Sequence, residues 1–140
     1  RRSAGEIPSA NQQIWLADTL GEMALWYGAA RLALIAGSLL PDIGGHNPIE
    51  ASQAGAVVLS GAHTASFDDL YALYRQHEAV ITVSNAASIA AALERVWSHR
   101  GPSIKAAKAA ITEASGGAMA TSLAALEALL EHGKPAEIAS

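Results

Sequence analysis

The chain has 140 residues, a net charge of −4, a hydrophobic content of 51% and no cysteine. This length suits one domain with a sizeable core, and the apolar content excludes intrinsic disorder. The acidic balance offers no overall basic surface for nucleic acid, and the lack of cysteine excludes disulfides and thiolate metal sites. The longest apolar stretch, 32–40, is interrupted by glycine and serine and is too short to cross a bilayer.

Short apolar runs alternate with amphipathic segments along the whole chain. The predicted strands are runs of four or five apolar residues, at 14–17, 32–36, 56–59 and 79–83. The predicted helices lie between them and after them, at 21–30, 48–54, 67–76, 88–99, 103–114 and 118–132. Glycine and proline at 100–102 and two glycines at 115–117 predict breaks between the last three helices. The alternation predicts an α/β fold whose parallel sheet, of about four or more strands, is covered on both faces.

The most informative segment runs from Gly44 to Glu50 (GGHNPIE), after the second predicted strand. Its glycines let the backbone approach a ligand closely, and Asn47 and Pro48 are typical of a helix start. Glu50 falls in the first turn, where the helix dipole favours a carboxylate. Free backbone N–H groups suit a phosphate, and a carboxylate suits sugar hydroxyls. The segment therefore indicates a nucleotide site, although an ordinary capped helix after a glycine loop explains the glycines and the cap equally well.

Polar and small residues follow each predicted strand, where ligands bind in parallel sheets. They lie at 18–22, 37–38, 60–64 and 84–85. Polar loops are also needed at these positions for solubility, so the pattern favours a site without defining it. His46 in the GGHNPIE run and His63 in the 60–64 loop could each have either a site role or a structural role.

Three ordered motifs and a late turn resemble segments of the bacterial 3-deoxy-D-manno-octulosonic acid (Kdo) transferases. Residues 18–23 with Tyr27-Gly28 are similar to the DTMGEL…YG segment of that family. Residues 37–39, the GGHNPIE run and Ala51 resemble its GGSL…GGHNPLEAA segment. Residues 58–67 resemble its VLxGPHTxNF segment, and 117–119 its late GAL turn. The resemblance extends over nearly the whole chain.

The resemblance implies a Rossmann-like, three-layer αβα domain, the carboxyl-terminal half of a GT-B glycosyltransferase. Residues 1–140 would form most of its CMP-Kdo-binding domain, and the amino-terminal acceptor domain would lie outside this chain. The parent enzyme would be inverting and metal-independent, with no cofactor, and would transfer Kdo from CMP-Kdo to a lipid A precursor. It would act at the cytoplasmic face of the bacterial inner membrane, and membrane association would come from the parent, while this part is expected to be soluble and to bind no nucleic acid.

The family's CMP contacts map onto residues of two motifs. They are Leu20, Gly21, Glu22, Asn47, Pro48, Ile49 and Glu50. A second set of expected site residues comprises Gly45, His46, His63 and Ser66. Glu22 has a structural alternative, which is to hold the loop by capping helix N–H groups. The family's general base is a Glu of the amino-terminal domain, so no catalytic residue is expected here, and the isolated chain is expected to be inactive.

Several positions depart from the family pattern. Ala62 replaces Pro, Ser66 replaces Asn, Arg31 replaces an acidic residue, and Ser115 and Thr121 replace Asn and Arg. These differences are consistent both with an altered donor preference and with neutral sequence variation in the loops. Two rival functions also remain: another GT-B donor domain for a UDP-sugar transferase or epimerase, and a non-catalytic nucleotide-binding module. A receiver-like regulatory domain is disfavoured, because no acidic cluster lies at a strand end and no Lys precedes Lys105.

Overall fold

The structure is a computed structural model that describes the backbone of residues 1–132 and the side chains of residues 1–126. Three parallel strands form one sheet in the order β1-β2-β3: β1 (Leu32–Ile35), β2 (Val57–Ser60) and β3 (Val80–Thr82). The helices are α1 (Met23–Ala29), α2 (Ile49–Gln53), α3 (Asp68–Gln76), α4 (Ala86–Trp97) and α5 (Ile104–His132). Each strand and the helices α1 to α4 lie within a few residues of the predicted positions, which confirms the α/β class.

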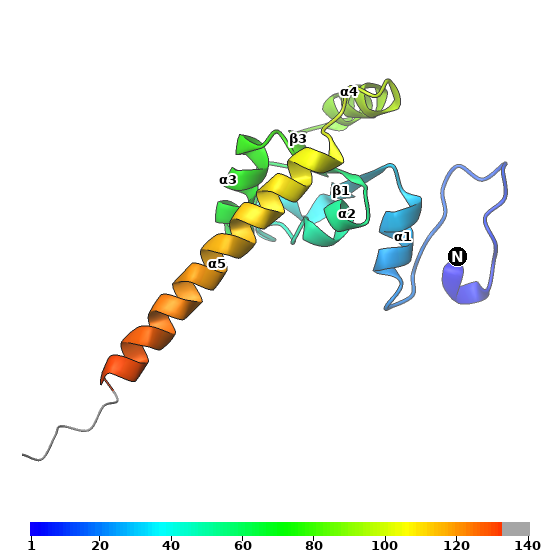
Figure 1. Ribbon diagram of the computed structural model, residues 1–140. Coiled ribbons are helices and arrows are strands. Elements are labelled where there is room, and N and C mark those ends of the chain that lie inside the picture. The colour runs from blue at the N-terminus through cyan, green and yellow to red at the C-terminus, as the bar shows by residue number, and fades with distance from the viewer. Residues whose placement is uncertain (133–140) are drawn as a thin grey trace, which may run out of the picture.

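Helices cover both faces of the sheet, giving three layers (Figure 1). On one face, side chains of α2, α3 and α5, including Ala51, Tyr74 and Ala110, pack against Ile35 and Val58. The opposite face carries a second cluster, in which Leu59 and Val83 pack with Ala92 of α4. Alternate residues of each strand point to opposite faces, so β2 supplies Val58 to one cluster and Leu59 to the other.

The predicted strand at 14–17 is absent, and this part of the prediction was wrong. Ile14 is 88% exposed and Leu16 is 52% exposed, and the segment pairs with no strand in the described part of the chain. Trp15 is the exception, because its ring packs edge-on against Trp26 of α1 with centroids 4.9 Å apart. An apolar run becomes a strand only where a neighbouring strand satisfies its backbone groups. The backbone here bonds instead to Arg2, which donates its N–H to the Leu16 carbonyl.

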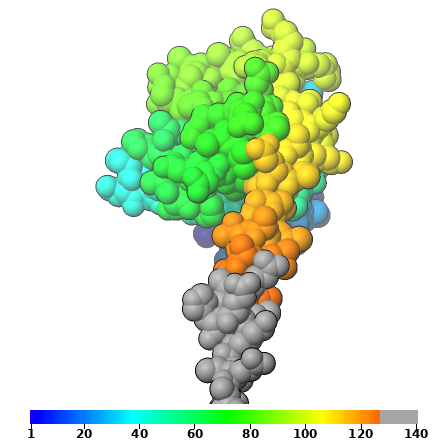
Figure 2. All heavy atoms as spheres, turned by 60° about the vertical axis from the view of Figure 1, so that its left-hand side comes forward, coloured from blue at the N-terminus to red at the C-terminus, as the bar shows by residue number. Residues whose placement is uncertain are grey.

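The predicted break at 115–117 was also wrong, because α5 continues through Gly116 and Gly117 as one helix of 29 residues. Neither glycine has the positive φ that ends helices. Ser115 and Thr121 lie on either side and donate their hydroxyls to carbonyls four residues earlier. The carboxyl-terminal half of α5 extends away from the sheet (Figure 1), and Figure 2 shows this part of the helix as far as residue 126. None of the described helices combines the length and apolar character that a bilayer crossing requires.

Candidate functional site

The loops after β1 and β2 are joined where the two strands end. The Ser38 hydroxyl donates to the Ile35 carbonyl and accepts the N–H of Gly61 at 2.6 Å. The Ser38 carbonyl in turn accepts the N–H of His63 at 3.0 Å. A Cβ at Gly61 would lie 2.1 Å from that carbonyl oxygen, so only glycine allows the two loops to approach this closely.

The glycine loop packs against the loop that follows β2. Gly44 and Gly45 are buried and have φ of 73° and 83°, which L side chains rarely adopt. A Cβ on Gly45 would lie 3.1 Å from the His63 carbonyl oxygen, and the Ser66 N–H donates to the Gly44 carbonyl at 3.0 Å. The Tyr71 hydroxyl of α3 donates to the His46 carbonyl at 3.0 Å. The backbone of this loop is therefore held at several points.

The start of α2 is fixed by neighbouring side chains and by α3. The helix begins at Ile49, with Pro48 and not Asn47 at the N-cap position, so it starts one residue later than predicted. Asn47 Oδ1 nevertheless accepts the N–H of Ile49 at 2.9 Å, which occupies one of the N–H groups expected to be free. Pro48 is buried, and Tyr74 of α3 donates its hydroxyl to Ser52 Oγ at 3.0 Å. Glu50 lies in the first turn and is exposed, so a rigid short helix presents its carboxylate to solvent.

Two shallow grooves meet at Glu50. The first, of about 650 Å³, lies between α1 and α2 and is lined by Gly21, Met23, Ala24, Glu50, Gln53 and Ala54. The second, of about 460 Å³, lies beside the end of β1 and is lined by Met23, Tyr27, Leu34, Ile35, Ala36, Gly37, His46, Asn47 and Glu50. Because Met23 and Glu50 border both, the two grooves form one elongated surface, which we call the Glu50 groove.

Two polar side chains of the Glu50 groove, Tyr27 and Glu50, are available to a ligand. Within residues 1–126, the carboxylate of Glu50 has no hydrogen-bond or ion-pair partner. Partial burial raises the pKa of the Tyr27 phenol, and the nearby negative charge of Glu50 raises it further. Tyr27 is therefore a neutral hydroxyl beside a carboxylate, a pair that can both donate to and accept from sugar hydroxyls.

The loop at 18–22 is occupied by contacts with the first residues of the chain. The Arg2 guanidinium donates to both carboxylate oxygens of Glu22, at 2.8 Å and 3.1 Å, and the Thr19 hydroxyl also donates to this carboxylate. These bonds lower the pKa of Glu22, with that from Arg2 contributing most. Glu22 makes no side-chain bond to the N–H groups of α1, so the loop is held by Arg2 and not by helix capping.

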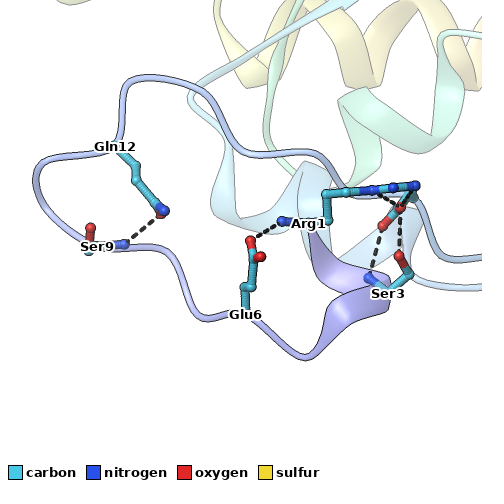
Figure 3. A network of polar contacts seen from close by, with 6 residues as sticks. Arg1, Ser3, Glu6, Ser9 and Gln12 are labelled. Carbon is cyan, nitrogen blue, oxygen red and sulfur yellow. Dashed lines mark hydrogen bonds and ion pairs between the residues drawn. The ribbon is translucent and has the colours of Figure 1, made fainter.

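Asp18 lies in a second network beside this loop. The Ser3 hydroxyl and N–H donate to its carboxylate at 2.7 Å and 2.8 Å, and Arg1 donates Nε at 2.9 Å (Figure 3). These bonds, the Ser3 hydroxyl above all, lower the pKa of Asp18 to about 2. Both acidic residues of the first motif are thus engaged by residues 1–3, whereas Glu50 is not.

The structure brings together part of the expected site. Gly21, His46, Asn47 and Glu50 line the Glu50 groove, and Gly45 lies buried within the loop beside it. Leu20 is fully exposed, and the side chain of Ile49 lines a different groove, between α3 and α5. His63 and Ser66 line neither half of the Glu50 groove; their backbones support the glycine loop.

Three further residues of the groove, Met23, Tyr27 and Gln53, were absent from the predicted site. Their spacing in the sequence indicates which helix faces they share. Met23 and Tyr27 are four residues apart in one helix, and Gln53 follows Glu50 by three, so each pair shares a helix face. In the part of the chain whose side chains are described, no cluster of three His, Asp or Glu residues is arranged to hold a metal ion.

Much of the chain is similar in sequence to known proteins. The chain is 38% identical over 95 residues to the 3-deoxy-D-manno-octulosonic acid transferase of Haemophilus influenzae, and 47% identical over 70 residues to that of Bordetella pertussis. This chain is homologous to the Kdo transferases. The matches cover 68% and 49% of this chain but only 21% and 16% of those enzymes. The chain thus spans about a fifth of the length of the Kdo transferase from H. influenzae. No family profile matches the chain.

The fold is also known among the Kdo transferases. The crystal structure of the C-terminal CMP-Kdo binding domain of WaaA from Acinetobacter baumannii superposes with a TM-score of 0.72 at 23% identity. The match covers 79% of this chain and 58% of that domain. The shared fold confirms the expected class, an α/β domain with a parallel sheet between layers of helices.

Proposed function

We propose that this chain is the donor-binding part of a Kdo transferase, and that the Glu50 groove holds CMP-Kdo. The parent enzyme transfers Kdo to a lipid A precursor at the cytoplasmic face of the bacterial inner membrane. The acceptor domain and the general base lie outside residues 1–140. The observation that carries this proposal is the convergence on one groove of two motifs that resemble Kdo transferase segments, one through Gly21 and the other through His46, Asn47 and Glu50.

Each part of the nucleotide has a matching group in the groove. The two ribose hydroxyls donate to the carboxylate of Glu50, which has no partner among residues 1–126. The phosphate lies beside Gly37, where the imidazole of His46 and the amide of Asn47 supply polar contacts. Gly21, with φ of 80°, allows the backbone of its loop to approach the ligand. A charge-assisted bond to Glu50 is about twice as strong as a neutral one, so Glu50 dominates the affinity.

The same assignment predicts binding without turnover. Displacement at the anomeric carbon requires donor, acceptor and base in one near-attack arrangement. This chain supplies donor contacts alone. The acceptor domain supplies the acceptor and the base, and the role of this chain is to orient CMP-Kdo so that the acceptor attacks the face opposite the leaving CMP.

A nucleotide titration followed by amide NMR shifts tests the proposal. We expect CMP to shift residues around Gly21, His46 and Glu50, with weaker binding of UMP and UDP. Glu50→Ala should reduce CMP affinity by about tenfold or more, because it removes hydrogen bonds to a charged group. Glu94→Ala is the matched control, since Glu94 is an exposed carboxylate on α4, on the opposite face of the sheet.

The outcomes separate the alternatives. Tighter binding of UDP than of CMP would indicate that the chain belongs instead to a UDP-sugar enzyme of the same architecture. Absence of any CMP-dependent shift at millimolar nucleotide, or equal affinity in the Glu50→Ala variant, would overturn the proposed donor site.

A further inference from the structure

Gln53 lies in the Glu50 groove but belongs to none of the motifs shared with the Kdo transferases. It follows Glu50 by three residues in α2, so the two side chains lie on the same face about 5–6 Å apart at Cβ. Both line the half of the groove that faces Gly21 and Met23. Gln53 is exposed, and its amide has no hydrogen-bond partner within residues 1–126. The groove therefore offers one amide whose donors and acceptor are free.

The order of the polar side chains along the groove matches the order of phosphate, ribose and base in a nucleotide. Asn47 and His46 border the half of the groove beside Gly37, Glu50 stands where the halves meet, and Gln53 borders the other half. In a nucleoside monophosphate the phosphate and the base are attached at opposite ends of the ribose, on either side of the ring oxygen. A ribose bound at Glu50 with its phosphate beside His46 directs its base toward Gln53.

We propose that Gln53 hydrogen-bonds the edge of the donor's nucleobase while Met23 packs against the base. This inference rests on the proposed function and deepens it by naming the residue that recognises the base. A cytosine edge presents an amine donor next to ring-nitrogen and carbonyl acceptors, and a glutamine amide presents two donors and one acceptor. Met23 is 49% exposed and adjoins both Glu50 and Gln53. A flexible thioether suits contact with an aromatic ring.

The experiment compares CMP with ribose 5-phosphate, which lacks the base. Both are titrated into the wild-type chain, Gln53→Met and the control Gln76→Met. Methionine keeps the length and helix propensity of glutamine and removes the amide. Gln76 ends α3, is exposed and does not line the Glu50 groove. The readouts are the dissociation constants and the side-chain amide signal of Gln53.

We expect Gln53→Met to weaken CMP binding by about three- to tenfold, the range of a net hydrogen bond. Ribose 5-phosphate affinity should not change, and Gln76→Met should bind both ligands normally. The Gln53 side-chain signal should move with CMP and not with ribose 5-phosphate. Thermal unfolding of each variant confirms that the substitution leaves the fold intact.

Two results would overturn the inference alone: unchanged CMP affinity in Gln53→Met, or an equal loss for CMP and ribose 5-phosphate. In both cases CMP binding that depends on Glu50 would leave the proposed function standing. A wild-type chain that binds neither ligand, or whose CMP binding does not depend on Glu50, would overturn the proposed function and the inference together.

Discussion

The guanidinium of Arg2 donates three hydrogen bonds to the carboxylate of Glu22, from Nη2 at 2.8 Å and from Nε at 3.1 Å to each oxygen. This pair connects the start of the chain to the loop that carries Gly21. Because both side chains are partly exposed, the pair orders the loop without adding much to global stability.

Arg2→Ala should therefore increase the mobility of the loop without unfolding the domain. We expect faster amide hydrogen exchange at residues 19–22 and a melting temperature close to that of the wild type. The control is Arg75→Ala, because Arg75 is exposed on α3 and forms no ion pair among the described side chains. A large fall in melting temperature for Arg2→Ala would show that the pair supports the whole fold instead.

The network around Asp18 predicts a pH-dependent release of residues 1–3. The pKa of Asp18 is lowered from 3.8 to about 2, so its bonds to Ser3 are fully present above pH 3.8 and are lost as the pH falls toward 2. The amide proton shift of Ser3, followed by NMR, should titrate with a midpoint near 2. Asp18→Asn should abolish this titration, and a midpoint near 4 in the wild type would contradict the network.

The contact between Gly61 and Ser38 predicts different effects for two alanine substitutions. Gly61→Ala places a Cβ 2.1 Å from a backbone oxygen and should destabilise the fold by about 1–3 kcal/mol. Gly28 lies within α1, and a Cβ added there meets no atom within 4 Å. Gly28→Ala should therefore stabilise the fold by about 0.5–1 kcal/mol. Urea unfolding measures both. A Gly61→Ala variant as stable as the wild type would mean that the two loops do not approach as described.

The elements that the sequence predicted well depend on local patterns. The strands at 32–35 and 57–60 are apolar runs bounded by turn residues, and α3 has apolar residues at helical spacing. The segment at 14–17 has the same local pattern but no strand beside it, and pairing is a non-local property. Glycines at 116 and 117 lower helix propensity by about 1 kcal/mol each, but they impose no turn without a positive φ.

The residues of the candidate site also fall into those that local sequence patterns predict and those that depend on tertiary packing. Asn47 and Glu50 could be identified from the sequence because a helix start has a local signature of cap, proline and first-turn carboxylate. Met23, Tyr27 and Gln53 could not, because their place in the groove depends on α1 packing beside α2. The position of Glu22 in the first motif predicted a ligand contact, but its carboxylate accepts hydrogen bonds from Arg2.

The hydrogen bond between Tyr74 and Ser52 predicts a coupled effect on stability. Both residues are buried, with 0% and 4% of their surface exposed, and their bond joins α3 to the helix that carries Glu50. Tyr74→Phe leaves the serine hydroxyl without this partner and should cost about 1–2 kcal/mol. Adding Ser52→Ala should recover part of that loss. Urea unfolding of the four proteins in this double-mutant cycle measures the coupling, and additive losses would contradict the bond.

The continuity of α5 can be tested at its two glycines. In a continuous helix, Gly116→Ala and Gly117→Ala should each favour the helical state by about 1 kcal/mol, because alanine has the higher helix propensity and a Cβ at either position meets no atom within 4 Å. Helicity by circular dichroism should rise, and amides of residues 112–120 should exchange more slowly. If the chain instead turned at these glycines with a positive φ, alanine would be strained there and helicity would fall. Because the two arrangements predict opposite signs for the same substitution, one spectrum of each variant distinguishes a straight α5 from a broken one.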